Sequence, residues 1–422
     1  MGRNVWILSS ISLAVAIGYG VVAPVLPLYA TEFGASAMQA AMVISAFALM
    51  RFVFSPAVGW LVGRFSHRVV LMSGLIIVAL SSASAGLASS LVWLIVLRGL
   101  GGIGSAMFSI SGMSVLLGSV APNKRGRAAG LYQGGFLLGA MAGPPLGGIF
   151  AQISLRAPFF FYAGTLTVAA LVALALRPVA AAALDGEAGA AEELGSGVAD
   201  AGATASAASP AGPGARPGGD EALPLRVVAR DRRFQAACLA NIVHGWNSHG
   251  ARAVLVPLFV AASLAASDKQ AAAWTAIAMG IASGVQIVMV WPAGWLADHF
   301  GRRGPMVAGG AICAVALAAT PWAGSIVVLT VALCLYAVGA ALLGGAPAAL
   351  VGDAAGQLKE RAVAVFSMCG DAGSIVGPLV VGALADVLSF EVAFATAGTL
   401  WALSALMSLT LPRGLQLSRA GR

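Results

Sequence analysis

One carboxylate in this sequence could carry a proton through an apolar environment. Of the 16 Asp and Glu residues, eight lie in 178–233, and seven of the others lie near the ends of long apolar runs. Only Asp371 lies well inside such a run, 362–386. Apolar burial raises the proton affinity of a carboxylate and a nearby arginine lowers it, so alternation between the two would load and unload a proton. The alternative is a permanent ion pair that only holds helices together.

Three arginines, Arg51, Arg98 and Arg252, also lie inside apolar runs. An arginine does not lose its charge in a protein, so each needs a compensating partner or access to water. Arg51 either lines a cavity or is structural, and the sequence does not decide between the two. Ionisable groups placed in this way indicate a path for ions or substrates rather than an enzyme active site.

The run 234–261 carries a polar series, Asn241, His244, Ser248 and Arg252. Spacings of three, four and four residues place these side chains on one face of a helix. Because a polar face toward lipid is unfavourable, we expect this face to line a cavity. His244 could carry a proton near pH 7, or it could be satisfied by a hydrogen bond to a neighbouring helix.

The composition explains why these residues are expected in a membrane. The chain is 59% hydrophobic and 9% charged, with a mean hydropathy of +0.91, far from the charge content of a soluble domain. Twelve apolar runs are long enough to span a bilayer as helices. They are roughly 5–29, 37–61, 69–89, 91–118, 128–151, 157–177, 234–261, 270–296, 305–323, 325–350, 362–386 and 391–411. The first lacks a small-residue cleavage site before the second, so we interpret it as an uncleaved helix rather than a signal peptide.

Basic residues predict the orientation of the chain. Of the 24 Lys and Arg residues, 19 lie at the termini and in alternate connections, and only Arg156 and Lys269 lie in the opposite connections. Positive residues favour the cytoplasmic side, so both termini are expected there, in the inner membrane. The net charge of +8 therefore reflects topology, and no nucleic-acid partner is expected.

The chain repeats itself. Residues 59–68 (GWLVGRFSHR) resemble 294–303 (GWLADHFGRR), and Gly143-Pro144 recurs as Gly377-Pro378 at an offset of 234. We therefore predict six-helix bundles at 1–177 and 234–422, in the same orientation, with a site between them near the midplane. Residues 178–233 form a low-complexity cytoplasmic linker whose end, 225–234, is expected to lie on the membrane as a short interfacial helix. A regulatory site in this linker is a less favoured alternative.

No cofactor or metal is expected. The cysteines, Cys238, Cys313, Cys334 and Cys369, all fall inside apolar runs, and their spacing matches neither a disulfide framework nor a metal cluster. The expected partners are a small-molecule substrate, protons and membrane lipids, and the chain is expected to function as a monomer.

These residues together resemble the major facilitator superfamily. Its signature after the second span is matched by the copy after the eighth span, at Gly294, Leu296, Asp298, Gly301, Arg302 and Arg303. The first copy keeps Gly59, Leu61, Arg64 and Arg68 but has Gly63 and Ser66 in place of the aspartate and second glycine. The resemblance implies an all-α membrane protein of twelve transmembrane helices in two six-helix pseudo-repeats, the major facilitator fold.

Two further strings carry the resemblance. Arg98-Gly99-x-x-Gly102-x-Gly104 looks like the family's span-four motif, which implies that Arg98 attracts the proton or the substrate. Gly139-x-x-x-Gly143-Pro144-x-x-Gly147-Gly148 is similar to the span-five motif of the twelve-span drug:proton antiporters, and Gly373-x-x-x-Gly377-Pro378 repeats its core. A Gly-x-x-x-Gly face lets helices approach closely, so we expect span five to pack, kinked, against a helix of the other half.

The resemblance also suggests roles in gating. The second and eleventh spans of the family are neighbours, so Arg51 could pair with Asp371. At the cytoplasmic side, Asp298 is expected to contact the start of span five together with Arg302, Arg125 or Arg127. Because Gly63 replaces the equivalent aspartate, only one of the two such interfaces would carry this charge, and Asp298→Asn should favour the inward-open state.

The sequence thus predicts an exporter of small hydrophobic or amphipathic compounds that works by proton antiport and alternating access. Proton coupling would rest on Asp371, Arg98 and His244. Substrate contacts are expected from polar and aromatic side chains inside the spans: Tyr19, Arg51, Gln133, Phe136, Asn241, Trp246, Ser248, Arg252 and Phe366. The alternatives are an uptake symporter for a metabolite and, less favoured, a transport-inactive sensor or scaffold.

Overall fold

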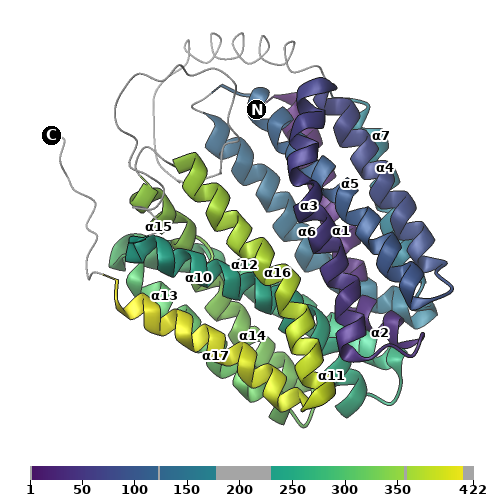
Figure 1. Ribbon diagram of the computed structural model, residues 1–422, viewed down its shortest axis with the longest axis vertical. Coiled ribbons are helices and arrows are strands. Elements are labelled where there is room, and N and C mark those ends of the chain that lie inside the picture. The colour runs from purple at the N-terminus through teal and green to yellow at the C-terminus, as the bar shows by residue number, and fades with distance from the viewer. Residues whose placement is uncertain (1, 122–123, 177–229, 356–358, 412–422) are drawn as a thin grey trace. The chain divides into compact units, whose positions relative to one another are not determined.

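The chain folds into helices that follow the predicted apolar runs (Figure 1). The computed structural model describes residues 2–121, 124–176, 230–355 and 359–411, without the side chains of Asp298, Phe300, 353–355 and 359–361. Contacts divide the chain into two units. Unit 1 comprises Met1–Ala35, Met42–Ser209 and Ser267–Ala276, and unit 2 comprises Ser36–Ala41, Pro210–Ala266 and Ile277–Arg422. The predicted bundles at 1–177 and 234–422 stay a prediction.

The first predicted half contains the helices α1 (Arg3–Val22), α2 (Leu26–Thr31), α3 (Ala37–Arg64), α4 (His67–Gly86), α5 (Leu91–Gly118), α6 (Arg125–Ile153) and α7 (Ala157–Ala173). The predicted first span is interrupted by a turn at Ala23–Val25, which contains Pro24. Proline lacks the amide hydrogen that would continue the helical hydrogen bonding.

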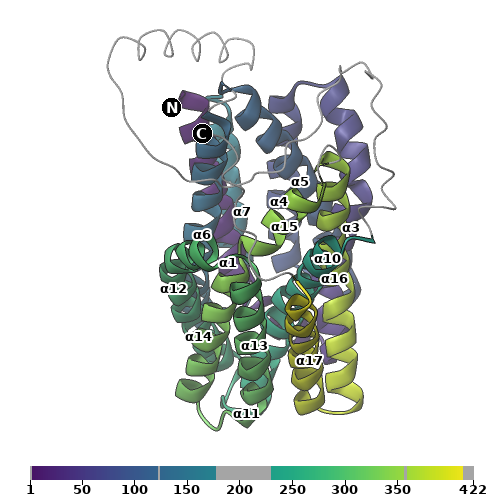
Figure 2. The same cartoon turned by 90° about the vertical axis from the view of Figure 1, so that its left-hand side faces the viewer.

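The second half contains α10 (Arg232–Trp246), the π-helix η2 (Asn247–Leu255), α11 (Val256–Ser263), α12 (Asp268–Phe300), α13 (Arg303–Ala319), the 3₁₀-helix η3 (Thr320–Trp322), α14 (Ile326–Leu343), α15 (Ala346–Ala355), α16 (Lys359–Val387) and α17 (Phe390–Leu409). Figure 2 shows the same helices from the side. Of the predicted interfacial helix, 232–234 already belong to α10 and Asp231 caps that helix, whereas 225–229 lie outside the described residues, as does most of the linker.

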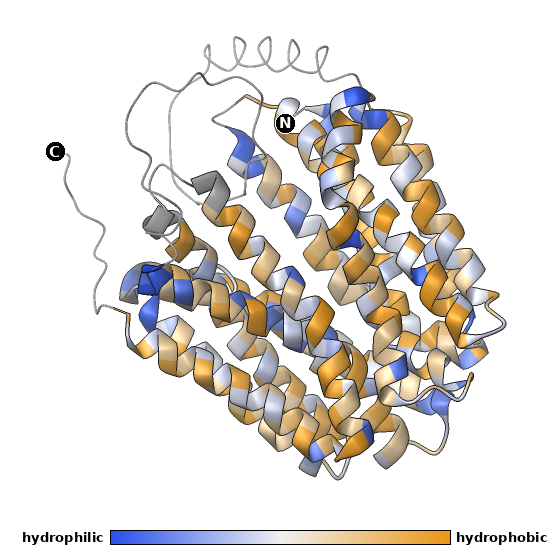
Figure 3. Cartoon of the chain, viewed as in Figure 1, coloured by the Kyte–Doolittle hydropathy of each residue, from blue (hydrophilic) through white to orange (hydrophobic). Residues whose placement is uncertain are grey.

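Ten of the described helices are long and apolar enough to cross a membrane. Figure 3 shows orange, hydrophobic residues along most helix lengths and blue residues at the start of α10. The equivalent starts of α5 and α14 are capped alike, by Ser90 and Ser325, whose hydroxyls accept the amides of Trp93 and Val328. Such caps satisfy an otherwise unpaired amide, and the shared cap supports the repeat.

The glycine face of α6 packs against α1. A Cβ built on Gly143 would lie 2.6 Å from the Cα of Gly20, and one built on Gly139 would lie 2.7 Å from the backbone nitrogen of Ile17. The Gly139 and Gly143 part of this face therefore meets α1 of the same half rather than a helix of the other half. The spacing predicts a close contact, but it does not say which helix supplies the opposing small residues. Further along the same motif, Gly148 approaches Ala273 and Ala276 of α12, a helix of the other predicted half, as expected, and Gln152 Nε2 donates to the carbonyl of Lys269 at 3.3 Å.

The repeat of this motif makes the same kind of contact in unit 2. A Cβ on Gly377 of α16 would lie 2.5 Å from the Cα of Trp246, and Gly373 faces the backbone of Ile242 and Trp246 in α10. In this way Gly139, Gly143 and Pro144, and their counterparts Gly373, Gly377 and Pro378, belong to equivalent helix pairs, α1–α6 and α10–α16.

The two signature turns differ in backbone conformation. In the second copy, α12 ends at Phe300 and Gly301 adopts a left-handed conformation, φ +76°. In the first copy the equivalent Ser66 has φ −63°, and its hydroxyl accepts the amide of Val69 at the start of α4. The loss of the second glycine in the first copy therefore accompanies a different turn, which needs no left-handed residue.

Candidate functional site

Arg98 is the most buried charged side chain in the described part of unit 1. It lies in α5 with 1% of its surface exposed, and its guanidinium carbon lies 4.7 Å from the centre of the Phe47 ring of α3. Its Nε and Nη1 have no acceptor within the described part of the chain. A cation–π contact compensates only part of the cost of burying this charge.

Two tyrosines complete the surroundings of Arg98. The Tyr19 ring of α1 lies 6.4 Å from that of Phe47, and both Tyr19 and Tyr162 are close enough to Arg98 for electrostatic interaction. The ring of Tyr162 lies against Gly18, where a larger residue would collide with it. The structure thus brings together Arg98 and Tyr19, both predicted from the sequence, with the help of two aromatic residues that were not.

Arg51 and Gln133 are exposed on α3 and α6. Arg51 is close enough to Tyr19 and Tyr132 for its charge to act on their hydroxyl groups. Phe136 packs between Tyr132 and Phe108, with ring centres 5.4 and 6.2 Å away. Phe136 is therefore part of an aromatic cluster within unit 1, whereas Arg51 and Gln133 are accessible.

In unit 2, the polar series of span seven continues into a π-helix. The expected α-helix changes to π-helical hydrogen bonding over η2, Asn247–Leu255. This change widens the helix, and such segments are frequent at functional sites. His244 Nε2 lies 3.4 Å from Ser248 Oγ, so these two residues, four apart, meet across the junction of α10 and η2.

Arg252 lies further along η2 and is partly buried. Its guanidinium carbon lies 5.4 Å from the centre of the Tyr336 ring of α14, and its charge acts on the thiol of Cys313 in α13. Tyr336 and Cys313 are both buried, and the Cys313 thiol donates to the Tyr336 carbonyl at 3.5 Å. Arg252 therefore lies beside an aromatic ring and a thiol, and its charge also acts on His244.

Asn241, the first residue of the polar series, contacts α16 rather than the other residues of the series, and so does its neighbour Trp246. The Asn241 amide donates to the Phe366 carbonyl of α16 at 2.7 Å, and Trp246 packs against Gly377. Both side chains therefore contribute to the contact between α10 and α16. Asp371, also on α16, is partly buried and engaged in an interaction of its own.

The signature residues have varied surroundings. Gly59 and Gly294 have open space where a side chain would begin, and Arg64 and Arg303 occupy the last turn of α3 and the first turn of α13. Arg302 precedes α13 and is engaged in an interaction. The side chain of Asp298 lies outside the described residues, so its predicted ionic contact stays a prediction.

Arg68 has a contact that the signature did not suggest. Its Nη2 donates to the carbonyl of Leu174, the C-cap residue that follows α7. This donor satisfies a carbonyl at a helix C-terminus, where a positive charge is also favourable. Arg68 thereby connects α4 with α7 inside unit 1.

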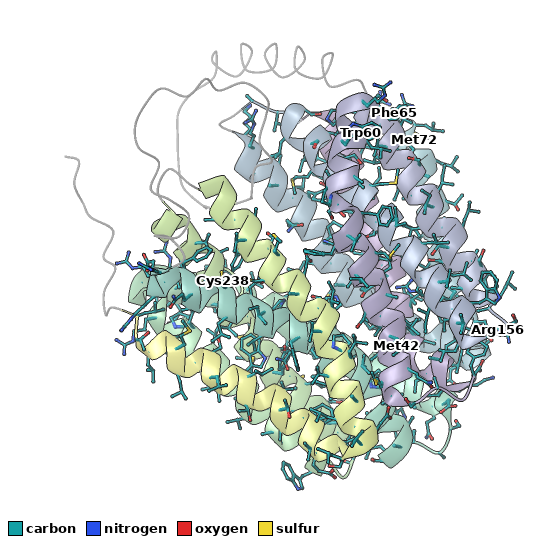
Figure 4. The ribbon with its side chains drawn as sticks, viewed as in Figure 1. Met42, Trp60, Phe65, Met72, Arg156 and Cys238 are labelled. Carbon is teal, nitrogen blue, oxygen red and sulfur yellow. The ribbon has the colours of Figure 1, made fainter. Side chains whose placement is uncertain are left out.

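The labelled side chains of Figure 4 show how unit 1 is ordered along its helices. Trp60, Phe65 and Met72, around the first signature, lie at one end of the unit, and Arg156, between α6 and α7, lies toward the other. This order is the one expected if successive connections alternate between the two sides of a membrane.

Phe47, Tyr162, Cys313 and Tyr336 were missed in the sequence. Each meets its arginine from a different helix, so no spacing connects the two residues. Apolar spans contain many aromatic residues that only pack, and the sequence offers no signal that separates these four from the others.

The described helices, ten of them long and apolar enough to cross a membrane, define a multi-pass membrane protein, and a few ionisable groups, among them Arg98 and Asp371, lie within its helices. The family model for the Major Facilitator Superfamily matches residues 8–249 and 237–419. The chain therefore belongs to the Major Facilitator Superfamily, and it has the fold of that family's transporters.

Curated relatives match over part of the chain. The quinolone resistance protein NorA of Staphylococcus aureus (strain MRSA252) is 28% identical over 177 residues, 41% of this chain and 44% of that protein. Multidrug resistance protein 1 of Bacillus subtilis (strain 168) is 30% identical over 159 residues, 37% of this chain and 41% of that protein. The matched region is thus less than half the length of each relative.

Solved structures match over nearly the whole chain. A bacterial homologue of the human lysosomal transporter Spinster, in an inward-facing and occupied conformation, aligns with a TM-score of 0.71 at 15% identity, covering 96% of this chain and 95% of that one. A mutant of the nucleoside transporter NupG aligns with a TM-score of 0.65 at 14% identity, covering 96% and 97%. At such low identity, these likenesses show the fold.

Proposed function

We propose that this transporter exports small hydrophobic or amphipathic compounds in exchange for protons. The observation that carries the proposal is the similarity to two proteins named for quinolone and multidrug resistance. The Gly139-x-x-x-Gly143-Pro144 string, typical of twelve-span drug:proton antiporters, supports the same branch.

In this proposal the two six-helix halves alternate access to a midplane cavity, as parallel-repeat transporters do. Asp371 takes up the proton on one side and releases it on the other, because its proton affinity changes with its surroundings. Arg98 and His244 assist, the first as a fixed charge and the second as a side chain that can accept and donate a proton. The protein works as a monomer in the inner membrane, with both termini cytoplasmic.

The test is substrate-induced proton release in everted membrane vesicles that contain the protein, repeated with Asp371→Asn. We expect wild-type vesicles to lose part of an imposed pH gradient when an exported compound is added, and the variant to show no such loss. Glu391→Gln, at the exposed first turn of α17, serves as the control for removing a carboxylate. Full coupling in Asp371→Asn would contradict the assignment of the proton carrier.

An uptake symporter on the same fold is the second candidate, since NupG is named as a nucleoside transporter. A gene deletion separates the two: sensitivity to toxic compounds supports export, whereas loss of growth on a nutrient without such sensitivity supports uptake. Absence of any substrate-dependent proton flux would favour a sensor or scaffold without transport activity.

A further inference from the structure

The surroundings of Arg252 carry one inference beyond the exchange of compounds for protons. Arg252 is a permanent positive charge inside the span formed by α10, η2 and α11. Its guanidinium carbon lies 5.4 Å from the centre of the neutral Tyr336 ring, and its charge acts on the nearby Cys313 thiol. Both of these residues are almost completely buried. A guanidinium in such a site has five N–H donors, and an aromatic face satisfies none of them by a conventional hydrogen bond.

The other polar groups of this helix favour the same kind of ligand. His244 and Ser248 lie 3.4 Å apart, and His244, Ser248 and Arg252 follow one another at intervals of four residues. In a helix with i→i+5 hydrogen bonds, one turn takes between four and five residues. Side chains four residues apart therefore lie on nearly the same face of the π-helix. Each of the three can donate a hydrogen bond, and Arg252 carries a permanent positive charge.

The geometry points to an anion-binding subsite at His244, Ser248 and Arg252, which recognises the carboxylate or another oxyanion of an exported amphipathic compound. The planar guanidinium suits a bidentate contact with a carboxylate, and Ser248 and His244 add donors one and two turns away. The apolar part of the compound then lies along the neighbouring spans. This inference rests on the proposed export function and adds to it the charge of the substrate.

The distribution of charge inside the spans agrees with this assignment. Arg51, Arg98 and Arg252 are three fixed positive charges, whereas Asp371 is the one acidic residue well inside a span. An excess of positive over negative charge inside the membrane is costly unless a counterion compensates it. An organic anion supplies it during each cycle, whereas an organic cation would increase the imbalance.

The test uses three fluorescent probes of the same shape and different charge: pyrenebutyrate, its uncharged methyl ester and pyrenebutylamine. Binding to the purified full-length protein is measured by energy transfer from its tryptophans, and export is measured in everted vesicles. We expect pyrenebutyrate to bind and be transported in preference to the ester and the amine.

Arg252→Gln should weaken pyrenebutyrate binding about tenfold or more, since a charge-assisted contact is lost, and should leave ester binding nearly unchanged. Arg252→Lys should restore part of the affinity, because it keeps the charge without the planar fork. Arg156→Gln, which removes an exposed arginine outside the spans, should bind all three probes as the wild type does. Thermal unfolding in detergent confirms that each variant is folded.

The inference is overturned if the wild type binds the amine or the ester as well as the acid, or if Arg252→Gln weakens the acid and the ester equally. It is overturned likewise if Arg252→Gln leaves acid binding unchanged. The proposed function fails differently: wild-type vesicles then export none of the probes and none of a panel of toxic compounds. Export of the ester or the amine without preference for the acid would therefore leave the export proposal intact.

Discussion

Gly20 of α1 and Gly143 of α6 face each other so closely that neither has room for a side chain. A Cβ on Gly143 would lie 2.6 Å from the Cα of Gly20, and one on Gly20 would lie 3.0 Å from the Cα of Gly143. Since the obstructing atoms belong to the backbone, a side chain cannot be accommodated by a change of rotamer. The glycines are therefore needed for the α1–α6 contact itself.

We expect Gly143→Ala to destabilise the folded protein by about 1–3 kcal/mol, the usual cost of overpacking. Thermal unfolding in detergent measures the change. Gly134→Ala is the matched control. Gly134 lies on the same helix, and no atom lies within 4 Å of the position that a Cβ would occupy there. Alanine also favours a helix more than glycine does. Equal melting temperatures for the two variants would show that α1 and α6 are not in close contact.

Arg98 offers a way to separate function from stability. Its guanidinium is buried over the Phe47 ring, with Nε and Nη1 lacking acceptors in the described residues. Replacing a buried charge with an apolar side chain of similar length is often neutral or stabilising. We therefore expect Arg98→Met to melt at the wild-type temperature or above it and to lose proton-coupled transport. A clearly lowered melting temperature would instead assign Arg98 to helix packing.

Arg68 gives a prediction of the opposite kind. Its hydrogen bond to the Leu174 carbonyl joins the start of α4 to the end of α7, and its charge favours that helix end. We expect Arg68→Gln to cost about 1 kcal/mol of unfolding free energy. Arg125→Gln, at the exposed first turn of α6, should cost nothing, because a positive charge is unfavourable at a helix N-terminus. If Arg68→Gln leaves stability unchanged but alters transport, a role in gating is supported over a structural one.

The sequence predicts the spans well because bilayer thickness and backbone hydrogen bonding leave few alternatives for long apolar runs. It predicts the glycine face of α6 for a similar reason, since spacing within one helix determines that face. It does not predict that α1 is the partner, because the choice of partner depends on the opposing surface. The interruption of span seven by η2, and the meeting of Arg252 with Tyr336, likewise depend on contacts between helices that are distant in sequence.

The two signature turns differ at one residue that changes the conformation of the backbone. At the position occupied by Gly301 in the second copy, the first copy has Ser66, and the backbone angles φ are +76° and −63°. The sequence comparison finds the substitution, and the structure shows that it accompanies a different way of ending one helix and beginning the next. The glycine is a conformational requirement of the second turn alone.

This difference gives a final prediction. Gly301→Ala should destabilise the protein by about 1 kcal/mol, because a residue with a Cβ is strained at positive φ. Gly301→Asn should cost less, since asparagine tolerates this conformation better than other residues with side chains. Gly304→Ala, in the first turn of α13 with open space around its Cα, should be neutral or stabilising. Thermal unfolding orders the three variants, and transport in vesicles is measured on the same preparations. If Gly301→Ala reduces transport while its melting temperature equals that of Gly304→Ala, backbone strain is not the reason for the glycine, and a contact made during the transport cycle is.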